Sequence, residues 1–465
     1  LHEKIFSQIM PNKMLKDKFS HKFIIKLLIM FFISIVYFIF MDLYSPLGTD
    51  WLDFHAQRIY NFSEYLKING YFSKYGFSIW NSCEDCSLKE EFSNGKIYKS
   101  KFFFSLAPYL FLNHFFNKEV LLFFGPIFDK FIVFACGVLL CEIVYKLSEK
   151  KYGQTYSYFF SMIVFIFFLI NPWTYKMIIA AWHSIYFFLL FFFAGLLSFL
   201  KKKQNIGIVF FLLASLCDYQ SACGLIVLYL IPKLIELFSN KKINLNEFFL
   251  LEEKESKSLI IILFSLCLGV SINFLCSISL ALNTENLVGS SFLSRIGISG
   301  IDIHNGSILG SLQFLAGNRI NVCIFNNNIS LLLNETKQLN NLIEIYNCFL
   351  SLGGMFILSL ISVYGIIKLY TAKESYRIII LPVGFLLLSY TSILQQSTSA
   401  HLMGYSFLFS VIFSLGISYF IIEMTKKTKF FISKIIFTIP IGFGFLLLCI
   451  RVNMLTGING KKLEN

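Results

Sequence analysis

The sequence has few charged residues for its length. Only 14% of its 465 residues are charged, whereas 56% are hydrophobic. A soluble domain of ordinary composition carries about 25% charged residues. The mean hydropathy is +0.68. This shortage of charge argues against a soluble globular domain, and the repeated apolar runs of about 20 residues predict an integral-membrane, multi-pass protein.

Several familiar motifs are also missing. The basic segments contain no Gly-rich nucleotide-binding loop, which argues against an ATP-driven transporter. Cys83 and Cys86 lie in a polar segment without a second pair at zinc spacing, so we expect a local disulfide on an oxidising face rather than a zinc site. No small-residue cleavage site follows the first apolar run, so we expect that run to stay as an anchor.

The apolar runs predict an all-α integral-membrane fold, a polytopic helical bundle of about 11 transmembrane helices. The expected spans are about 23–43, 122–145, 155–171, 177–199, 205–217, 222–238, 258–281, 347–369, 376–393, 402–424 and 430–450. The corresponding organisation is an N-terminal tail, a transmembrane domain and a C-terminal tail, at 1–22, 23–451 and 452–465. A further apolar patch, 102–116, contains Pro and Asn and is expected to be interfacial or re-entrant.

The net charge of +13 has a topological explanation. Its Lys runs lie between apolar segments, where cytoplasmic loops of membrane proteins carry positive charge. This distribution argues against nucleic acid as a partner. It predicts a cytoplasmic N-terminus and places the first loop, 44–121, and the long loop, 282–346, on the non-cytoplasmic side. The C-terminal tail with Lys461 and Lys462 departs mildly from the rule.

Arginine is scarce, and most of it falls on the predicted outer side. Of five Arg, Arg58, Arg295, Arg319 and Arg451 lie there or at its boundary. The planar guanidinium binds phosphate through two parallel hydrogen bonds, which lysine cannot do. The distribution favours phosphate binding on the outer face, and the alternative is chance in a small sample.

The segment "GTDWLDFHAQRIYNFSEYL", residues 48–66, directly follows the first apolar run. Its pattern predicts an amphipathic helix that is capped near Thr49 or Asp50 and lies on the outer membrane surface. Two interpretations stay open for its acidic face. It is either a solvated surface beside the membrane, or it holds a general base, Asp53 or Asp50, for an acceptor hydroxyl.

The stretch "LDFHAQRIY" resembles the Gly-Asp-Tyr-Glu-Ala-Gln-Arg-His-Trp segment of the dolichyl-phosphate-glucose glucosyltransferases. Those enzymes belong to the GT-C class of multispan glycosyltransferases, which use polyprenyl-phosphate sugars. The resemblance aligns Asp53 with the family's catalytic Asp and retains Ala56, Gln57 and Arg58. His55 stands where the family has Glu, so a second acid is not implied there.

Three later stretches follow the order of the same family. "INPWTYKMIIAAWHSIYFFLL" aligns His183 with a family histidine, without the accompanying Gln and Asn. "SLCDYQSACGLIVLYLIP" keeps Gln220 and has Asp218 where the family has no acid. "STSAHLMGYSFLF" supplies His401 without the family's Glu and Lys. The resemblance therefore implies the GT-C class, but not glucosyl specificity.

These observations predict an inverting membrane glycosyltransferase that acts on the non-cytoplasmic face. The expected partners are a polyprenyl-phosphate sugar donor, a lipid-linked glycan, polysaccharide or protein acceptor, and membrane lipids. No cofactor is required, although a pair of carboxylates could hold a divalent metal. The expected catalytic residues are Asp53 and Asp50, and the expected substrate- or phosphate-binding residues are Arg58, His183, Asp218, Gln220, Arg295, Arg319 and His401.

Two alternatives to this function remain. A polymerase or ligase of cell-surface polysaccharide would share a long outer loop with Arg and His, but would not need a carboxylate base in the first loop. A flippase or transporter for lipid-linked sugars would place polar residues in the middle of the apolar runs, where few are found.

Overall fold

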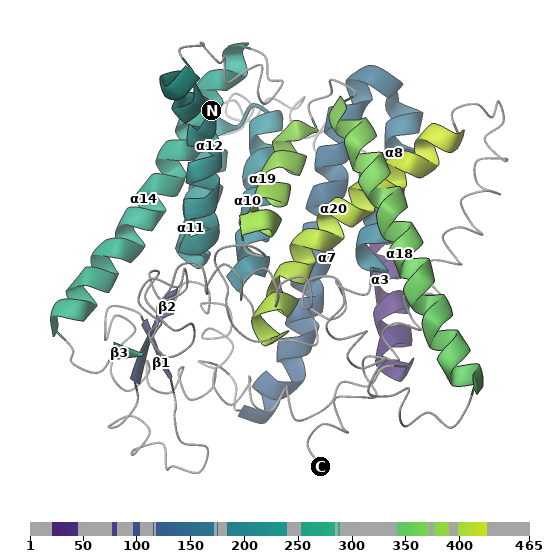
Figure 1. The fold of residues 1–465 in the computed structure, drawn as a ribbon, viewed down its shortest axis with the longest axis horizontal. Helices are drawn as coiled ribbons and strands as arrows, with labels where there is room; N and C mark the ends of the chain where they lie inside the picture. Colours follow the sequence, from purple (N-terminus) through teal and green to yellow (C-terminus); the bar gives the residue numbers. More distant parts are fainter. Residues whose placement is uncertain are drawn as a thin grey trace, which may run out of the picture.

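A computed structural model shows a helical protein with one small sheet (Figure 1). The structure describes residues 21–44, 77–80, 96–102, 115, 118–171, 174, 184–239, 253–283, 287–288, 342–371, 376–389 and 399–425. Within these ranges the helices are α3 (His21–Tyr44), α7 (Lys118–Tyr152), α8 (Gln154–Leu169), α10 (Ser184–Leu200), α11 (Gln204–Cys217), α12 (Tyr219–Ser239), α14 (Glu253–Asn283), α18 (Leu342–Thr371), α19 (Arg377–Ser389) and α20 (Ser399–Thr425).

Short breaks divide the central helices into antiparallel pairs. Gly153 separates α7 from α8 with a φ of 76°, which suits glycine because it has no Cβ. The amide of Lys203 reaches back to the carbonyl of Ser198 at the end of α10, so the turn to α11 closes by a hydrogen bond. Asp218 alone separates α11 from α12.

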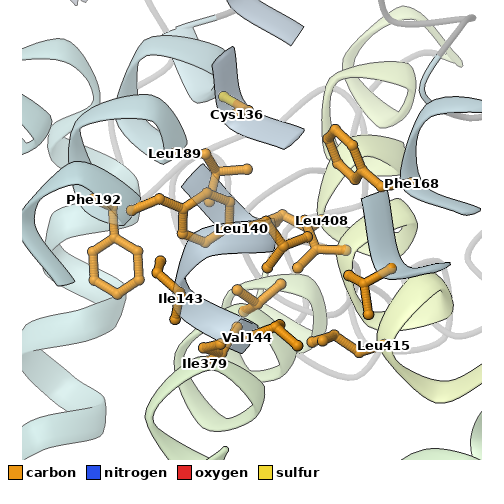
Figure 2. Packing of buried hydrophobic residues seen from close by; sticks show 14 of the residues in the cluster. Cys136, Leu140, Ile143, Val144, Phe168, Leu189, Phe192, Ile379, Leu408 and Leu415 are labelled. Atoms are coloured by element: carbon orange, nitrogen blue, oxygen red, sulfur yellow. The ribbon is translucent and has the colours of Figure 1, made fainter. Parts of the chain in front are cut away.

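The core lies around α7, which packs between α8 and α10. Figure 2 shows its side chains Cys136, Leu140, Ile143 and Val144 meeting residues of neighbouring helices. These neighbours come from α8, α10, α19 and α20, namely Phe168, Leu189, Phe192, Ile379, Leu408 and Leu415. Burying such large side chains contributes about 1.5–3 kcal/mol each, so this apolar centre is the main stabilising feature of the described helices.

Helices α18 and α20 approach each other closely through glycine. A Cβ on Gly416 would collide with the backbone carbonyl of Ser362, and a Cβ on Gly365 would collide with the carbonyl of Gly416. The Ser362 hydroxyl donates a hydrogen bond to the carbonyl of Phe413 at 3.1 Å. The small residues therefore let the two backbones approach closely enough for a side chain to bond across them.

The sheet has the order β1-β2-β3. Strand β1 (Phe77–Trp80) pairs antiparallel with β2 (Lys96–Phe102), and β2 pairs parallel with β3 (Leu287–Val288). The parallel register sets Ile97 opposite Leu287. The sheet thus pairs two residues of β2 with the two residues of β3, which are far apart in the sequence, and the all-α prediction is wrong for these strands.

One end of the helix bundle, called the sheet end here, carries the strands (Figure 1). The amino-terminal part of α10 lies beside the middle and the earlier residues of α7, since the Cys136 thiol contacts the carbonyl of Tyr186 at 3.8 Å and the ring of Phe187 lies 6.4 Å from that of Phe128. Glycines pair α10 with α11 in antiparallel register, with Gly195 against Phe211 and Gly207 against Phe199. The starts of α7, α10 and α12 and the ends of α8 and α11 therefore share the sheet end.

The predicted bundle of about 11 transmembrane helices is contradicted. Among the described residues, none of the helices combines the length and the apolar character that crossing a bilayer requires. Helices α8, α10, α11 and α19 have 16, 17, 14 and 13 residues. At 1.5 Å per residue, 16 residues extend about 24 Å, which is less than the roughly 30 Å of a hydrocarbon core. Several of the apolar runs therefore form helices that are shorter than a membrane span requires.

The other predictions about the organisation of the chain concern residues that the structure does not describe. The tails 1–22 and 452–465, the expected span 430–450 and the expected amphipathic helix near Thr49 lie wholly or almost wholly outside the described residues, as does the predicted Cys83–Cys86 pair.

Candidate functional site

Charged side chains are rarely buried in the described part of the chain. Each buried one marks a place in the interior where polar groups are needed around it. Lys26 is 4% exposed, Asp129 is 1% exposed and Asp218 is 7% exposed. Burying a charge is costly unless it is paired and hydrogen-bonded. Two of the three, Asp129 and Asp218, lie toward the sheet end, so this end is the candidate functional site.

Asp218 joins two helices at the sheet end. Its amide donates to the carbonyl of Ala214 at the end of α11, and its own carbonyl accepts from the amide of Ala222 in α12, both at 3.1 Å. Its carboxylate accepts hydrogen bonds from the Ser221 amide at 3.4 Å and from the Ser221 hydroxyl at 2.8 Å. An extended backbone and a side-chain oxygen that accepts from the backbone amide of the third helical residue are the features of a helix N-cap. The acid that the sequence singled out therefore caps α12.

Two cysteines border the Asp218 carboxylate. Burial, with the added charge of Asp218, raises the pKa of Cys217 well above its usual value. Burial, followed by Asp218 and then Cys267, raises the pKa of Cys223 to about 11. Thiols with raised pKa values are poor nucleophiles at neutral pH. The cysteines around Asp218 are therefore not suited to covalent catalysis.

Asp129 forms the second acidic position of the site, on α7. It lies near Tyr186 of α10, whose pKa is raised well above its usual value by burial and by the charge of Asp129. The rings of the adjacent residues, Phe128 and Phe187, are 6.4 Å apart. Sequence reasoning missed Asp129. The available signal was a carboxylate inside the apolar run 122–145, where an acid is expensive without a partner.

The turn after α8 adds polar groups at the same end of the bundle. The Thr174 hydroxyl donates to the carbonyl of Phe168 at 2.7 Å, and its amide donates to the carbonyl of Asn171 at 3.0 Å. Both Asn171 and Thr174 are buried. Since α7 and α8 are antiparallel, with Gly137 against Phe165, this turn lies near the level of Asp129.

Two further predicted residues belong to helices that begin at the sheet end. Gln220 lies in the first turn of α12, and His401 lies in the first turn of α20. Helix α20 runs antiparallel to α8, because Tyr156 contacts Ile422 and Phe160 contacts Tyr419. The first turn of α20 is thus directed to the same end as the last turn of α8. The structure brings the backbones of Asp218, Gln220 and His401 to one end of the bundle.

The remaining predicted site residues fall outside the described residues. These are Asp50, Asp53, Arg58, His183, Arg295 and Arg319. Within the described ranges, no group of three or more His, Cys, Asp or Glu side chains could hold a metal ion. The divalent metal that Asp50 and Asp53 could hold therefore stays a prediction.

We expect replacement of Asp218 by Ala to lower the free energy of unfolding by about 1 kcal/mol, because an N-cap is lost. Asp218→Asn keeps a capping oxygen and should remain close to the wild type. Thermal unfolding of the purified variants measures the difference. If Asp218→Asn and Asp218→Ala unfold at the same temperature, capping is not the role of this side chain.

No protein-family model matches the chain, and no curated protein matches it either.

Proposed function

We propose that the protein transfers a sugar from a polyprenyl-phosphate carrier to a glycan, lipid-linked or protein acceptor, with inversion at the sugar carbon. The observation that carries the proposal is the backbone pairing of β2 with β3. This pairing sets Ile97 and Tyr98 beside Leu287 and Val288. In the sequence, Asp53 and Arg58 precede the first of these strands, and Arg295 and Arg319 follow the second.

The proposed reaction needs two kinds of side chain from these two segments. Asp53 accepts the proton of the acceptor hydroxyl while the acceptor oxygen bonds to the sugar carbon. The bond between that carbon and the phosphate oxygen breaks, and polyprenyl phosphate leaves with its negative charge. Arg58, Arg295 or Arg319 stabilises that charge as it develops. The resemblance of residues 52–60 to the GT-C glucosyltransferases supports this assignment of Asp53.

A lipid-linked donor also requires an apolar surface for its hydrocarbon chain. Large apolar side chains are exposed along several helices, with Phe32 of α3 at 68% and Phe264 of α14 at 67%. A further exposed group lies on α18, at Ile357, Leu360, Val363, Tyr364 and Ile367. Exposed apolar patches of this kind mark interaction surfaces. We propose that the prenyl chain of the donor packs on these faces, with the sugar on the non-cytoplasmic side.

The donor class is tested by supplying the purified protein with labelled sugars on different carriers, together with an organic extract that contains lipid-linked acceptors. Polyprenyl-phosphate sugar should be consumed, and the corresponding nucleotide sugar should not. A donor with a shortened prenyl chain should bind more weakly because it buries less hydrocarbon. Transfer from the nucleotide sugar, or consumption only of a glycan carried on lipid diphosphate, would contradict the proposal; the second result would favour a polysaccharide polymerase or ligase.

A further inference from the structure

Asn273 of α14 is a buried amide of which only one half is hydrogen-bonded. The residue is 4% exposed. Its Nδ2 donates to the carbonyl of Ser215 on α11 at 3.2 Å and to the carbonyl of Gly269 on its own helix at 3.1 Å. In the part of the chain that the structure describes, no group donates to its Oδ1, although this oxygen is buried.

The two carbonyls fix the orientation of the Asn273 amide. A carbonyl oxygen only accepts hydrogen bonds, so the NH₂ half of the amide must face it. Rotation of the amide by 180° would set Oδ1 against the carbonyls of Ser215 and Gly269 and would remove both hydrogen bonds. The atom without a partner is therefore an acceptor, and the group that satisfies it must be a donor.

The hydroxyls of the neighbouring helices are already used. Ser215 Oγ donates to the carbonyl of Leu212 at 2.8 Å, and Ser221 Oγ donates to the carboxylate of Asp218 at 2.8 Å. A buried acceptor without a donor destabilises the folded state, because it has lost its hydrogen bonds to water. Native proteins rarely retain such an atom unless a further molecule binds it. A donor from outside the described helices is therefore required at Asn273.

The unsatisfied oxygen lies at the sheet end of the bundle. Ser215, which Asn273 contacts, is in the last turn of α11, and Asp218 follows one turn later, about 4.5 Å further along the axis. Strand β2 contacts α11, and Figure 1 shows the sheet beyond the ends of α11 and α14. The end of a helix also offers carbonyls without partners in the helix. The junction of α11, α12 and α14 thus presents acceptors close to the candidate site.

The chemistry of these acceptors favours a neutral donor. Within the described ranges, no group of three or more His, Cys, Asp or Glu side chains could hold a metal ion. The carboxylate of Asp218 is already engaged by the amide and the hydroxyl of Ser221. A hydroxyl group donates a hydrogen bond without bringing a charge into the interior, where an unbalanced charge is costly.

We propose that the junction of α11, α12 and α14 is a binding site for a hydroxyl group, which donates its hydrogen to Oδ1 of Asn273. The hydroxyl belongs to a water molecule or to a sugar. The sugar case rests on the proposed function and would make Asn273 a sugar-binding residue of that reaction. The hydrogen bond itself does not depend on the proposed function.

The hydrogen bond is tested by infrared spectroscopy of protein that carries ¹³C in the side-chain carbonyl of asparagine. The reference is Asn273→Thr, because a threonine hydroxyl can still donate to the carbonyl four residues earlier, at Gly269, while its methyl replaces the acceptor. The difference between the two spectra isolates the Asn273 band, which should lie at the lower frequency of a hydrogen-bonded carbonyl. A band at the frequency of a carbonyl without a donor overturns the proposal. If Asn273→Thr does not fold, Asn273→Ser is the reference.

The source of the hydroxyl is tested by thermal unfolding with methyl glycosides of hexoses and of N-acetylhexosamines. Binding to the folded state raises Tm. If the hydroxyl belongs to a sugar, one of these glycosides should raise Tm and shift the Asn273 band, and Asn273→Thr should lose the rise in Tm. The matched control is Ser265→Ala on the same helix, which removes a hydroxyl that already donates to the carbonyl of Ile261 and should keep the response.

The outcomes separate this inference from the proposed function. A hydrogen-bonded Asn273 band that no glycoside changes supports the site with water as its ligand. A rise in Tm that persists in Asn273→Thr, or that is lost equally in Ser265→Ala, overturns the sugar case. A wild type without sugar transfer contradicts the proposed function, whereas the infrared band still decides whether Asn273 accepts a hydrogen bond.

Discussion

Replacement of Asp53 by Asn is expected to lower kcat for sugar transfer by about 10²–10⁴-fold, the usual contribution of a general base. Asparagine has nearly the shape of aspartate and can still accept a hydrogen bond, but it cannot take the proton of the attacking hydroxyl. Binding of the polyprenyl-phosphate donor should therefore persist. The measurement is the initial rate of label transfer at saturating donor, together with donor binding to the purified variant.

Asp50→Asn is the matched control for this experiment. Asp50 lies three residues before Asp53 in the same segment and carries the same charge. Replacing either residue by Asn therefore removes one negative charge from this segment. We expect a smaller fall in kcat than in Asp53→Asn. Equal and normal rates in both variants would remove the carboxylate base from the mechanism. A larger effect in Asp50→Asn would transfer that role to Asp50.

Replacement of Gly416 by Ala is expected to destabilise the protein by about 1–3 kcal/mol, the range for overpacking in a close-packed interface. The added methyl would meet the carbonyl of Ser362, and backbone cannot rotate away as a side chain can. Helices α18 and α20 would have to separate, which would also weaken the hydrogen bond from Ser362 to Phe413. Chemical or thermal unfolding of the purified variant measures the loss.

Gly384 of α19 provides the control for the Gly416 variant. It is also a helical glycine, but nothing lies within 4 Å of an added Cβ. Gly384→Ala should therefore raise the free energy of unfolding by about 0.5–1 kcal/mol, since alanine loses less backbone entropy in a helix. The account of the close crossing fails if both variants change stability in the same direction and by the same amount.

The helices of the core could be predicted because their sequence pattern is local. Long apolar runs form α7, α8, α10 and α20 close to the predicted ranges, and Gly153 breaks the chain where its conformation requires a glycine. The prediction of transmembrane spans from those runs was wrong. It assumed that each apolar run forms one helix of the same length, whereas several of the helices are shorter. The strands were missed because β1 and β3 have only 4 and 2 residues, too short for a recognisable alternation.

The long-range contacts of the site could not be read from the sequence. Lys26 of α3 and Glu142 of α7 form an ion pair although they are 116 residues apart, and each alone looks like an isolated charge in an apolar run. The parallel pairing of β2 with β3 joins residues about 190 apart, and no local pattern specifies such a pairing. Asp218 could be singled out because an acid is costly between apolar runs, but its capping of α12 depends on the position of the Ser221 amide.

The measurement that tests the central claim most directly follows a donor with two labels, tritium in the sugar and radioactive phosphorus in the phosphate. Incubated with purified protein and an acceptor extract, it should give tritium in the acceptor while the phosphorus stays on the polyprenol, because the carbon–oxygen bond of the sugar is broken. Both labels remaining on the donor would contradict sugar transfer and leave a carrier of lipid-linked sugars as the better explanation. Both labels moving together to the acceptor would also contradict the account, because the bond between the sugar carbon and the phosphate oxygen would then stay intact.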